Sequence, residues 1–369
     1  MPQDTYDLVI VGAGPAGANL ARLLADSPLR LLLIDGQNEQ TPKPCGGLLA
    51  PDAQTVLAEM DLTLPRDVLV DPQIFSVRTI DLVPSRTRFY ARRYLNMDRL
   101  AFDRWLLSLV PSSVDVVRGL CRTVARTSDG YSLCCRLADG TENTVHTRMV
   151  VGADGANSTV RRALLGKRRD RILRYVAIQQ WFDSGSEINP FYSCIFDEQT
   201  SPVCSWSVHK DGSMIFGGCF PQKQCRAHFD EQRRRVGRLP SFAPLNTQPK
   251  KTEACLVCRP RRMRDMITGR DGIFLVGEAA GLISPSSFEG ISPALISSRA
   301  LASVLKKAPD ANLPVLSRAY RRATVRLRYR LLGKCIKRIF MYTPLLRRLA
   351  MKSGLLTIRV EQSDAADMH

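Results

Sequence analysis

The sequence predicts an α/β fold with a parallel-sheet domain, an antiparallel-sheet domain inserted into it, and a C-terminal helical tail. A strand, a glycine-rich turn and a helix open the chain, short strands with turn signals follow in its middle, and a buried strand and a helix return afterwards. We expect the first domain over 1–170 and 260–310, the second over 171–259, and a basic helical segment over 311–369. Hydrophobic residues make up 44% and charged residues 24%, which is usual for a folded globular protein.

The first element is a buried strand over 6–11, followed by a helix over 15–26 and a second strand over 29–34. Glycines in the intervening turn let the backbone approach a pyrophosphate, and the helix N-terminus offers unpaired N–H groups and a partial positive charge. A carboxylate after the second strand can accept hydrogen bonds from ribose hydroxyls. The residues predicted to form this dinucleotide clamp are Gly12, Gly14, Pro15, Ala16, Gly17 and Asp35. The alternative is a strand–turn–helix with incidental glycines.

Two further motifs follow predicted strands. The first is Gly152-Ala-Asp154-Gly-Ala-Asn-Ser-Thr-Val-Arg161, and the second is Gly277-Glu278-Ala-Ala-Gly281 followed by Gly290-Ile291 at the start of a helix over 291–307. Both resemble motifs of flavin-dependent hydroxylases. In the motif that Gly277 begins, the resemblance implies that a carboxylate bonds a ribitol hydroxyl and that a helix N-terminus faces the isoalloxazine. Three motifs in this order indicate FAD, because an NAD-only dehydrogenase would need the first alone. The first domain is therefore expected to be a Rossmann-like FAD-binding domain of the glutathione-reductase/hydroxylase type.

Other positions in this superfamily map onto the chain by resemblance. The superfamily usually has Asp where this chain has Glu278, so the ribitol contact could be direct or through water. A helix is expected from Asp98 to Leu109, capped by Asn96 or Asp98. Arg99 in its first turn is a pyrophosphate ligand by resemblance, or a surface arginine.

The loop Lys43-Pro44-Cys45-Gly46-Gly47 comes just after the ribose-binding end of the clamp. It resembles the P-x-x-C-G-G loop of the geranylgeranyl reductase family of FAD enzymes. The likeness to bacterial CbrA-type oxidoreductases of that family extends through 45–54, 175–182, 191–197, 205–212 and 277–281. The resemblance implies non-covalent FAD, an external electron donor such as NAD(P)H or ferredoxin, and hydride delivery to a carbon–carbon double bond of a prenyl chain. In that subgroup Glu278 is the expected residue.

Reduction of an isolated alkene needs a proton donor beside the flavin, and the Cys45 thiol is the candidate. The alternative is that Cys45 only packs within its loop. Trp206, with Trp181, Phe191 and Tyr192, could wall an apolar substrate channel, or could form the core of the second domain. We expect no metal site, because the chain has four histidines and its Cys255-x-x-Cys258 pair stands alone.

The net charge of +18 is concentrated near the C-terminus, where residues 318–359 hold thirteen Lys or Arg and no acid. Apolar residues at helical spacing run from Tyr320 to Tyr342, with a break expected at Pro344. Such a segment suits an anionic membrane surface, and the alternative is a helix docked on the second domain. Nucleic acid fits less well, because aromatic residues are not interleaved with the basic ones.

Eleven cysteines without a pairing pattern and a strand that begins almost at Met1 favour a cytoplasmic protein, peripheral on the membrane if the basic tail binds it. The leading functional hypothesis is reduction of prenyl double bonds. The alternatives are an FAD-dependent monooxygenase of a lipophilic or aromatic substrate and a non-catalytic flavin-binding protein of the membrane surface. The sequence leaves the oligomeric state open.

Overall fold

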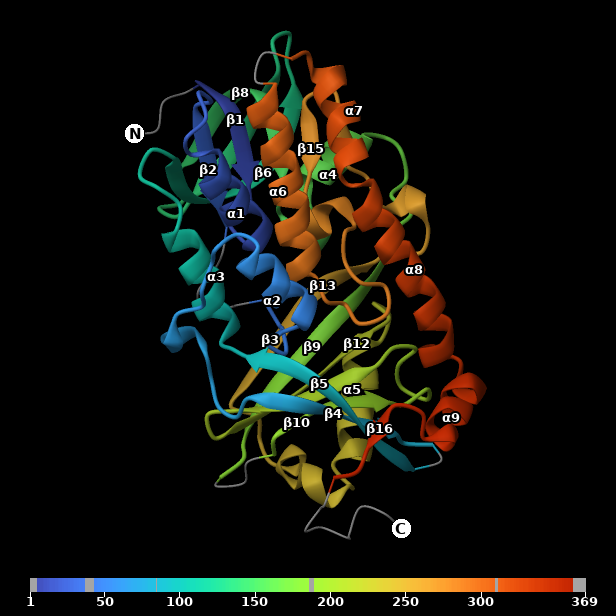
Figure 1. Ribbon diagram of the computed structural model, residues 1–369. Helices are drawn as coiled ribbons and strands as arrows, with labels where there is room; N and C mark the ends of the chain where they lie inside the picture. The colour runs from blue at the N-terminus through green and yellow to red at the C-terminus, as the bar shows by residue number, and fades with distance from the viewer. Residues whose placement is uncertain (1–4, 37–42, 84, 186–188, 309–310, 361–369) are drawn as a thin grey trace. The chain divides into compact units, whose positions relative to one another are not determined.

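The computed structural model describes residues 5–36, 43–83, 85–185, 189–308 and 311–360. The chain divides into two compact units (Figure 1). The first unit comprises residues 1–40, 102–173 and 258–335, and the second comprises residues 41–101, 174–257 and 336–369. Within the described residues, none of the helices has the length and apolar character needed to cross a membrane.

A seven-stranded sheet forms the centre of the first unit. Its strands are β1 (Thr5–Val11), β2 (Leu31–Asp35), β6 (Asp115–Arg126), β7 (Tyr131–Leu137), β8 (Glu142–Gly152), β14 (Gly269–Arg270) and β15 (Ile273–Leu275). Strands β6, β2, β1, β8 and β15 pair in parallel, and β7 joins the distal parts of β6 and β8 antiparallel. The parallel core is the Rossmann-like arrangement predicted from the sequence.

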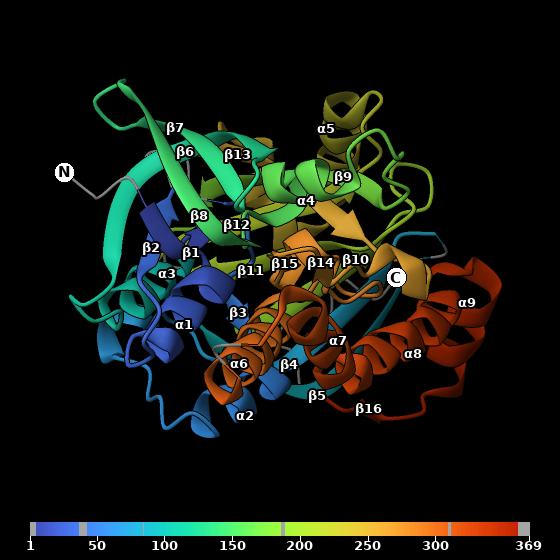
Figure 2. The ribbon, with the colours of Figure 1, turned by 90° about the horizontal axis from the view of Figure 1, so that it is seen from above.

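Helices cover both faces of this sheet, which explains why its central strands are continuously apolar. The helices are α1 (Pro15–Leu24), α3 (Arg99–Ser108), α4 (Thr159–Leu165), α6 (Ile291–Lys307), α7 (Leu313–Ala323) and α8 (Val325–Tyr342), of which α3 and α8 extend into the second unit. Leu8 and Ile10 pack in the cluster with α1 and α6, whereas Val9 and Val11 pack in the cluster with α4. Figure 2 shows α1 and α6 side by side.

The second unit contains a nine-stranded sheet. Its main strands follow the order β13 (Lys251–Arg259), β9 (Leu173–Asp183), β12 (Ser213–Phe220), β11 (Ser205–Lys210), β10 (Phe191–Phe196), β4 (Ile74–Asp81), β5 (Arg86–Asn96) and β16 (Thr357–Ile358), while β3 (Leu48–Leu49) pairs with β5. The unit also holds α2 (Pro51–Ala58), α5 (Cys225–Val236) and α9 (Pro344–Ser353). Antiparallel pairing dominates, as predicted, although β4 and β10 are parallel neighbours.

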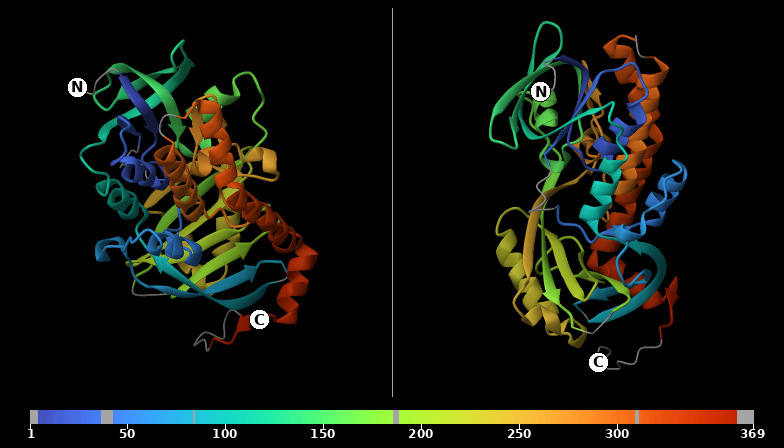
Figure 3. Two further views of the ribbon diagram at one scale, coloured as in Figure 1. Left: turned by 45° about the horizontal axis from the view of Figure 1, so that its top comes forward. Right: turned by 90° about the vertical axis from the view of Figure 1, so that its left-hand side faces the viewer.

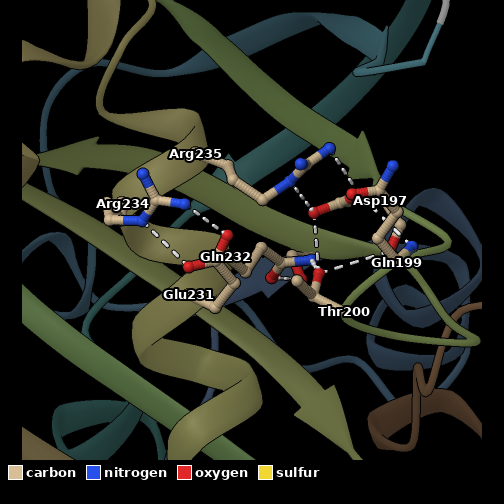
Figure 4. A network of polar contacts seen from close by, with 8 residues as sticks. Asp197, Gln199, Thr200, Glu231, Gln232, Arg234 and Arg235 are labelled. Atoms are coloured by element: carbon tan, nitrogen blue, oxygen red, sulfur yellow. Dashed lines mark hydrogen bonds and ion pairs between the residues drawn. The ribbon is translucent and has the colours of Figure 1, made fainter.

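Helix α5 is fixed to one face of this sheet by a buried polar network (Figure 4). The Arg235 Nε atom lies 2.8 Å from Oδ2 of Asp197, whose side chain is fully buried. Gln232 donates to the Thr200 hydroxyl at 2.9 Å, and Thr200 donates to Asp197 at 2.8 Å. Phe229 of α5 packs on the same face against Phe216 and Phe220. Helix α5 therefore covers this face, whereas Trp206 packs in a separate cluster of the same unit.

The compact units differ from the predicted domain boundaries in two places. Residues 43–101 group with the second unit and not with the first, because β4 pairs with β10, as in the Thr79–Cys194 register. Residues 336–360 also pack with the second unit. Figure 3 shows β4 and β5, in blue and teal, continuing the sheet formed by the green strands. Parallel pairing between segments more than a hundred residues apart leaves no local mark in the sequence, so the predicted boundaries followed chain order.

The C-terminal helices form where the apolar spacing predicts them, with one extra break. Pro344 occupies the first turn of α9 after a break at Thr343, as expected. The predicted stripe from Tyr320 is also interrupted at Thr324, whose hydroxyl donates to the Tyr320 carbonyl between α7 and α8. A Thr hydroxyl that competes for a helical carbonyl is a known cause of such a bend.

Candidate flavin site and the cysteine loop

The three predicted flavin motifs converge in the first unit. Val11 of β1 pairs with Gly152 of β8, and Leu275 of β15 pairs with the same residue. The turns that follow these three parallel strands therefore start from one edge of the sheet. Ligands of open α/β sheets bind at this carboxyl edge.

Close backbone contacts hold the motifs together. Gly12 has φ +104, and a Cβ atom there would lie 2.6 Å from the Ala153 carbonyl oxygen, one residue before Asp154. A Cβ atom at Gly17 would overlap the Gly12 carbonyl, so the first turn of α1 also requires glycine. At Gly277, a Cβ atom would approach the Cβ atom of Ala16 to 3.1 Å. The second and third motifs thus pack directly against the first.

The start of α1 fits an anionic pyrophosphate. Its N-cap is Gly14, which supplies no capping side chain, Pro15 follows, and the first turn contains no acid. A Cβ atom at Gly14 would meet nothing within 4 Å, so space adjoins the unpaired N–H groups. Asp35 ends β2 and is 5% exposed. Helix α6 likewise begins at Gly290 and Ile291 without a side-chain cap.

Asp154 has one carboxylate oxygen bonded and one that finds no donor in the described part of the chain. Oδ2 accepts the N–H groups of Thr159 at 2.7 Å and Val160 at 3.3 Å, whereas Oδ1 is buried without a partner there. Desolvation by burial raises the pKa of Asp154. A buried unpaired acceptor beside the clamp fits a hydroxyl donor of a dinucleotide.

Glu278 is held by the protein backbone. Its Oε1 atom accepts the N–H of Cys258 at 2.8 Å, which links the third motif to β13. The additional methylene of Glu, relative to Asp, lets the carboxylate reach this amide. The ribitol contact of Glu278 stays a prediction, as do the contacts of Gly277, Gly290 and Ile291 with the flavin.

The cysteine loop lies in the second unit, between the end of β5 and the end of β11. Gly47 has φ +59, and its N–H donates to the Cys45 sulfur at 3.4 Å. A Cβ atom at Gly47 would lie 2.6 Å from the Lys210 Nζ atom and would also overlap the Met97 carbonyl. The turn at Gly47 therefore accepts only glycine. The N–H group that bonds the Cys45 sulfur belongs to this glycine.

Lys210, which no sequence motif indicated, binds this loop through its buried ammonium group. Its Nζ atom donates to the Gly47 carbonyl at 3.1 Å, the Asn96 Oδ1 atom at 2.5 Å and the Met97 carbonyl at 2.7 Å. Three acceptors match the three protons of an ammonium group. Burial lowers the pKa of Lys210 to about 8, against the opposing effect of Cys45, Asp98 and Asp211. The alternation of side chains along β11 puts Lys210 on the same face of the strand as Trp206, and this was the one sequence pattern that could have indicated Lys210.

The Trp206 ring lies between the cysteine loop and the sheet. A Cβ atom at Gly46 would be 3.6 Å from the ring, and one at Gly217 on β12 would lie within 2.6 Å of it. The indole N–H donates to Gln179 at 3.0 Å. Glycine at 217 therefore leaves the space that the Trp206 ring occupies on this face.

An apolar wall surrounds Trp206 within the second unit. Trp181 and Tyr192 pack in the same cluster as predicted, together with Leu48, Tyr94, Cys194 and Val208. The Trp181 N–H donates to Glu253 at 3.2 Å, and Glu253 also accepts from Gln179 at 3.0 Å. Phe191 departs from the prediction: it packs on Phe89, with ring centroids 5.0 Å apart, because adjacent residues of a strand face opposite sides of the sheet.

Arg99 starts α3 and is half-buried. The predicted cap of this helix is confirmed at Asp98, whose Oδ1 atom accepts the Ala101 N–H at 2.7 Å. Asn96, the other candidate, instead bonds Lys210. The pyrophosphate role of Arg99 stays a prediction. The clamp residues, Asp154, Glu278, Gly290 and Ile291 lie in the first unit, whereas Cys45, Gly46, Gly47, Arg99 and Trp206 lie in the second.

Comparison with protein families supports these motifs. Residues 122–320 match the FAD binding domain family, and residues 7–173 match the lycopene cyclase protein family. The chain is 46% identical over 358 residues to protein CbrA of Escherichia coli strain K12, covering 96% of this chain and 98% of that protein. Protein CbrA of Shigella sonnei is also 46% identical with the same coverage.

Solved structures share the fold. A geranylgeranyl bacteriochlorophyll reductase-like protein from Thermoplasma acidophilum superposes with a TM-score of 0.81 at 21% identity, covering 99% of this chain and 94% of that one. PqsL, a probable FAD-dependent monooxygenase from Pseudomonas aeruginosa, superposes with a TM-score of 0.70 at 19% identity, covering 95% and 99%. Both superpositions extend over at least 95% of this chain, so both structures share its overall fold.

Proposed function

This chain belongs to the CbrA family of FAD-binding flavin enzymes, and from that membership we propose that it reduces carbon–carbon double bonds of a prenyl lipid. The observation that supports this proposal is the apolar wall of Trp206, Trp181 and Tyr192 beside the Cys45 loop in the second unit. In this proposal the hydrocarbon chain lies against the aromatic rings of the wall, and the loop supplies a thiol.

The two indole rings of the wall present hydrocarbon surface because their N–H groups are already bonded. The N–H groups of Trp206 and Trp181 donate to Gln179 and Glu253 within the sheet. A prenyl chain laid against these rings leaves no indole N–H unsatisfied, whereas a polar substrate would find few partners there.

Reduced FAD, when bound, supplies a hydride to one alkene carbon, and a proton must reach the other. We assign that proton to the Cys45 thiol. Loss of the proton leaves a thiolate that accepts the Gly47 N–H and is attracted by the Lys210 ammonium, and solvent then restores the thiol. The alkene gains one hydride and one proton, and no other oxidant or reductant is consumed.

An anaerobic half-reaction tests this proposal. The purified holoenzyme is reduced with dithionite and mixed with a polyprenol, and flavin reoxidation is followed by absorbance while the lipid is weighed by mass spectrometry. We expect reoxidation with a gain of 2 Da for each double bond reduced. Reoxidation only after oxygen is admitted, with a gain of 16 Da, would support the alternative of a monooxygenase acting on a lipophilic or aromatic substrate.

Substitution of the thiol separates its chemical role from packing. Cys45→Ser should lower prenyl reduction about 100-fold, because a hydroxyl is a much weaker acid, while the FAD content stays unchanged. Cys225→Ser, a partly exposed cysteine at the start of α5, is the matched control. Unchanged turnover in Cys45→Ser would remove Cys45 from the mechanism without affecting the proposed substrate class.

A further inference from the structure

Large apolar side chains are exposed in unusual number on the C-terminal part of the second unit. Eight of the fourteen exposed large hydrophobic residues in the described part of the chain fall between residues 336 and 358. They are Ile336, Ile339, Phe340, Leu345, Leu349, Leu355, Leu356 and Ile358, with exposed fractions from 38% to 81%. We call residues 336–359 the C-terminal apolar surface. Contiguous exposed apolar residues mark interaction sites.

Helical spacing groups these side chains on faces. Ile336, Ile339 and Phe340 follow the i, i+3, i+4 pattern at the end of α8, so they share one side of that helix. Leu345 and Leu349 are four residues apart on α9, and Leu355 and Leu356 follow directly after the helix ends. The exposed residues therefore form three local groups, at the end of α8, on α9 and directly after α9.

Helix α9 buries Arg347 and exposes two of its three leucines. Arg347, 6% exposed, bonds both oxygens of Asp81 at 2.8 and 3.2 Å and lies 4.7 Å over the Phe196 ring. Leu345 and Leu349 are 66% and 55% exposed. A helix that only completed a core would bury its leucines, so the buried ion pair fixes an orientation that presents them outward.

The charge of the C-terminal apolar surface indicates its partner. The surface holds six Lys or Arg and no acid. Arg347 pairs with Asp81 and Arg348 with Glu198. The other four, which are Lys337, Arg338, Lys352 and Arg359, take part in no ion pair among the described residues.

We propose that the C-terminal apolar surface docks the protein on an anionic phospholipid bilayer. Leucine, isoleucine and phenylalanine side chains would enter the boundary between headgroups and acyl chains, and the four cations would meet lipid phosphates. A second copy of the chain is a poorer occupant, because it would bring two cationic surfaces together. The proposal rests on this surface alone and is independent of the flavin reaction.

Vesicle co-sedimentation of the full-length, FAD-loaded protein tests the proposal. We expect binding to phosphatidylcholine vesicles that contain phosphatidylglycerol, at least tenfold weaker binding to phosphatidylcholine alone, and release by high salt. The double variant Leu345→Ser/Leu349→Ser should weaken binding to the anionic vesicles at least tenfold. Both leucines are exposed, so its unfolding transition should not change.

The matched control is Phe75→Ser. Phe75 is 67% exposed on β4 of the same unit, six residues along the strand from Asp81, or roughly 20 Å. The control should bind vesicles like the wild type. Equal loss in control and double variant, or full binding by the double variant, would overturn the proposal. Conversion of a dimer to a monomer in the double variant, with vesicle binding retained, would assign the surface to a second copy instead.

Discussion

Lys210→Met tests whether the buried ammonium holds the cysteine loop. The change removes the donor of Asn96 Oδ1 and Met97 O, whereas the Gly47 carbonyl keeps its bond from the Met97 N–H at 2.9 Å. Two buried oxygens without a donor cost about 2–6 kcal/mol. Burial lowers the pKa of Lys210 from 10.5 to about 8, so the buried charge costs folding free energy. Removal of this charge should stabilise the folded state by about 3 kcal/mol at most.

The net change should therefore lie between a gain of about 1 kcal/mol and a loss of about 3 kcal/mol of folding free energy, while the loop loses its support. A displaced loop moves the Cys45 sulfur, and misplacement by about 1 Å can lower turnover about 100-fold. Urea unfolding followed by tryptophan fluorescence measures the change in stability, and reduction of the proposed prenyl substrate at unchanged FAD content measures the change in turnover. Lys306→Met, which breaks an exposed pair with Asp26, is the control. Turnover within threefold of wild type would refute the assigned role of Lys210.

The pH dependence of Lys210 has a definite sign. Because its folded pKa of about 8 lies below the ordinary 10.5, the unfolded chain binds more protons between those values. The free energy of unfolding should therefore rise from pH 8 to 10.5, by about 3 kcal/mol at most. Above pH 8 the neutral amine has two protons for three oxygens, so turnover should fall. Identical pH profiles of stability in wild type and Lys210→Met would contradict this assignment.

Three further predictions concern other positions. Gly14→Asp should fold normally, since its side chain meets open space, but should lose FAD affinity at least tenfold by repelling the pyrophosphate; full retention of yellow flavin would contradict the clamp. Arg347→Met leaves Asp81 buried and unpaired and should lower the free energy of unfolding by about 3–5 kcal/mol in urea, whereas a loss below 1 kcal/mol would show that the pair does not hold α9. Gln179→Leu removes the acceptor of the Trp206 N–H and should raise the KM for the lipid about tenfold at similar kcat; an unchanged KM would separate Trp206 from substrate binding.

Local sequence patterns predicted the positions of the three flavin motifs correctly. The strand–turn–helix around Gly12, the acidic turn at Asp154 and the start of α6 at Ile291 appear where the sequence indicates them, because each depends on residues close together in the chain. Alternation in β10 also requires Phe191 and Tyr192 to face opposite sides. Which of them joins Trp206 could not be read from alternation, since that depends on what packs against each face.

Local patterns in the sequence were sufficient to predict the fold class, the glycine-rich turn after β1 and the cationic C-terminal segment, because these depend on neighbouring residues and on composition. Tertiary structure alone decided three things: that β4 joins β10, that Lys210 lies under the Cys45 loop, and that α9 turns its leucines outward. Each depends on a partner far along the chain, such as Asp81 for Arg347, 266 residues away. A buried charge is stable only beside groups that compensate it, and folding brings those groups together from distant parts of the chain.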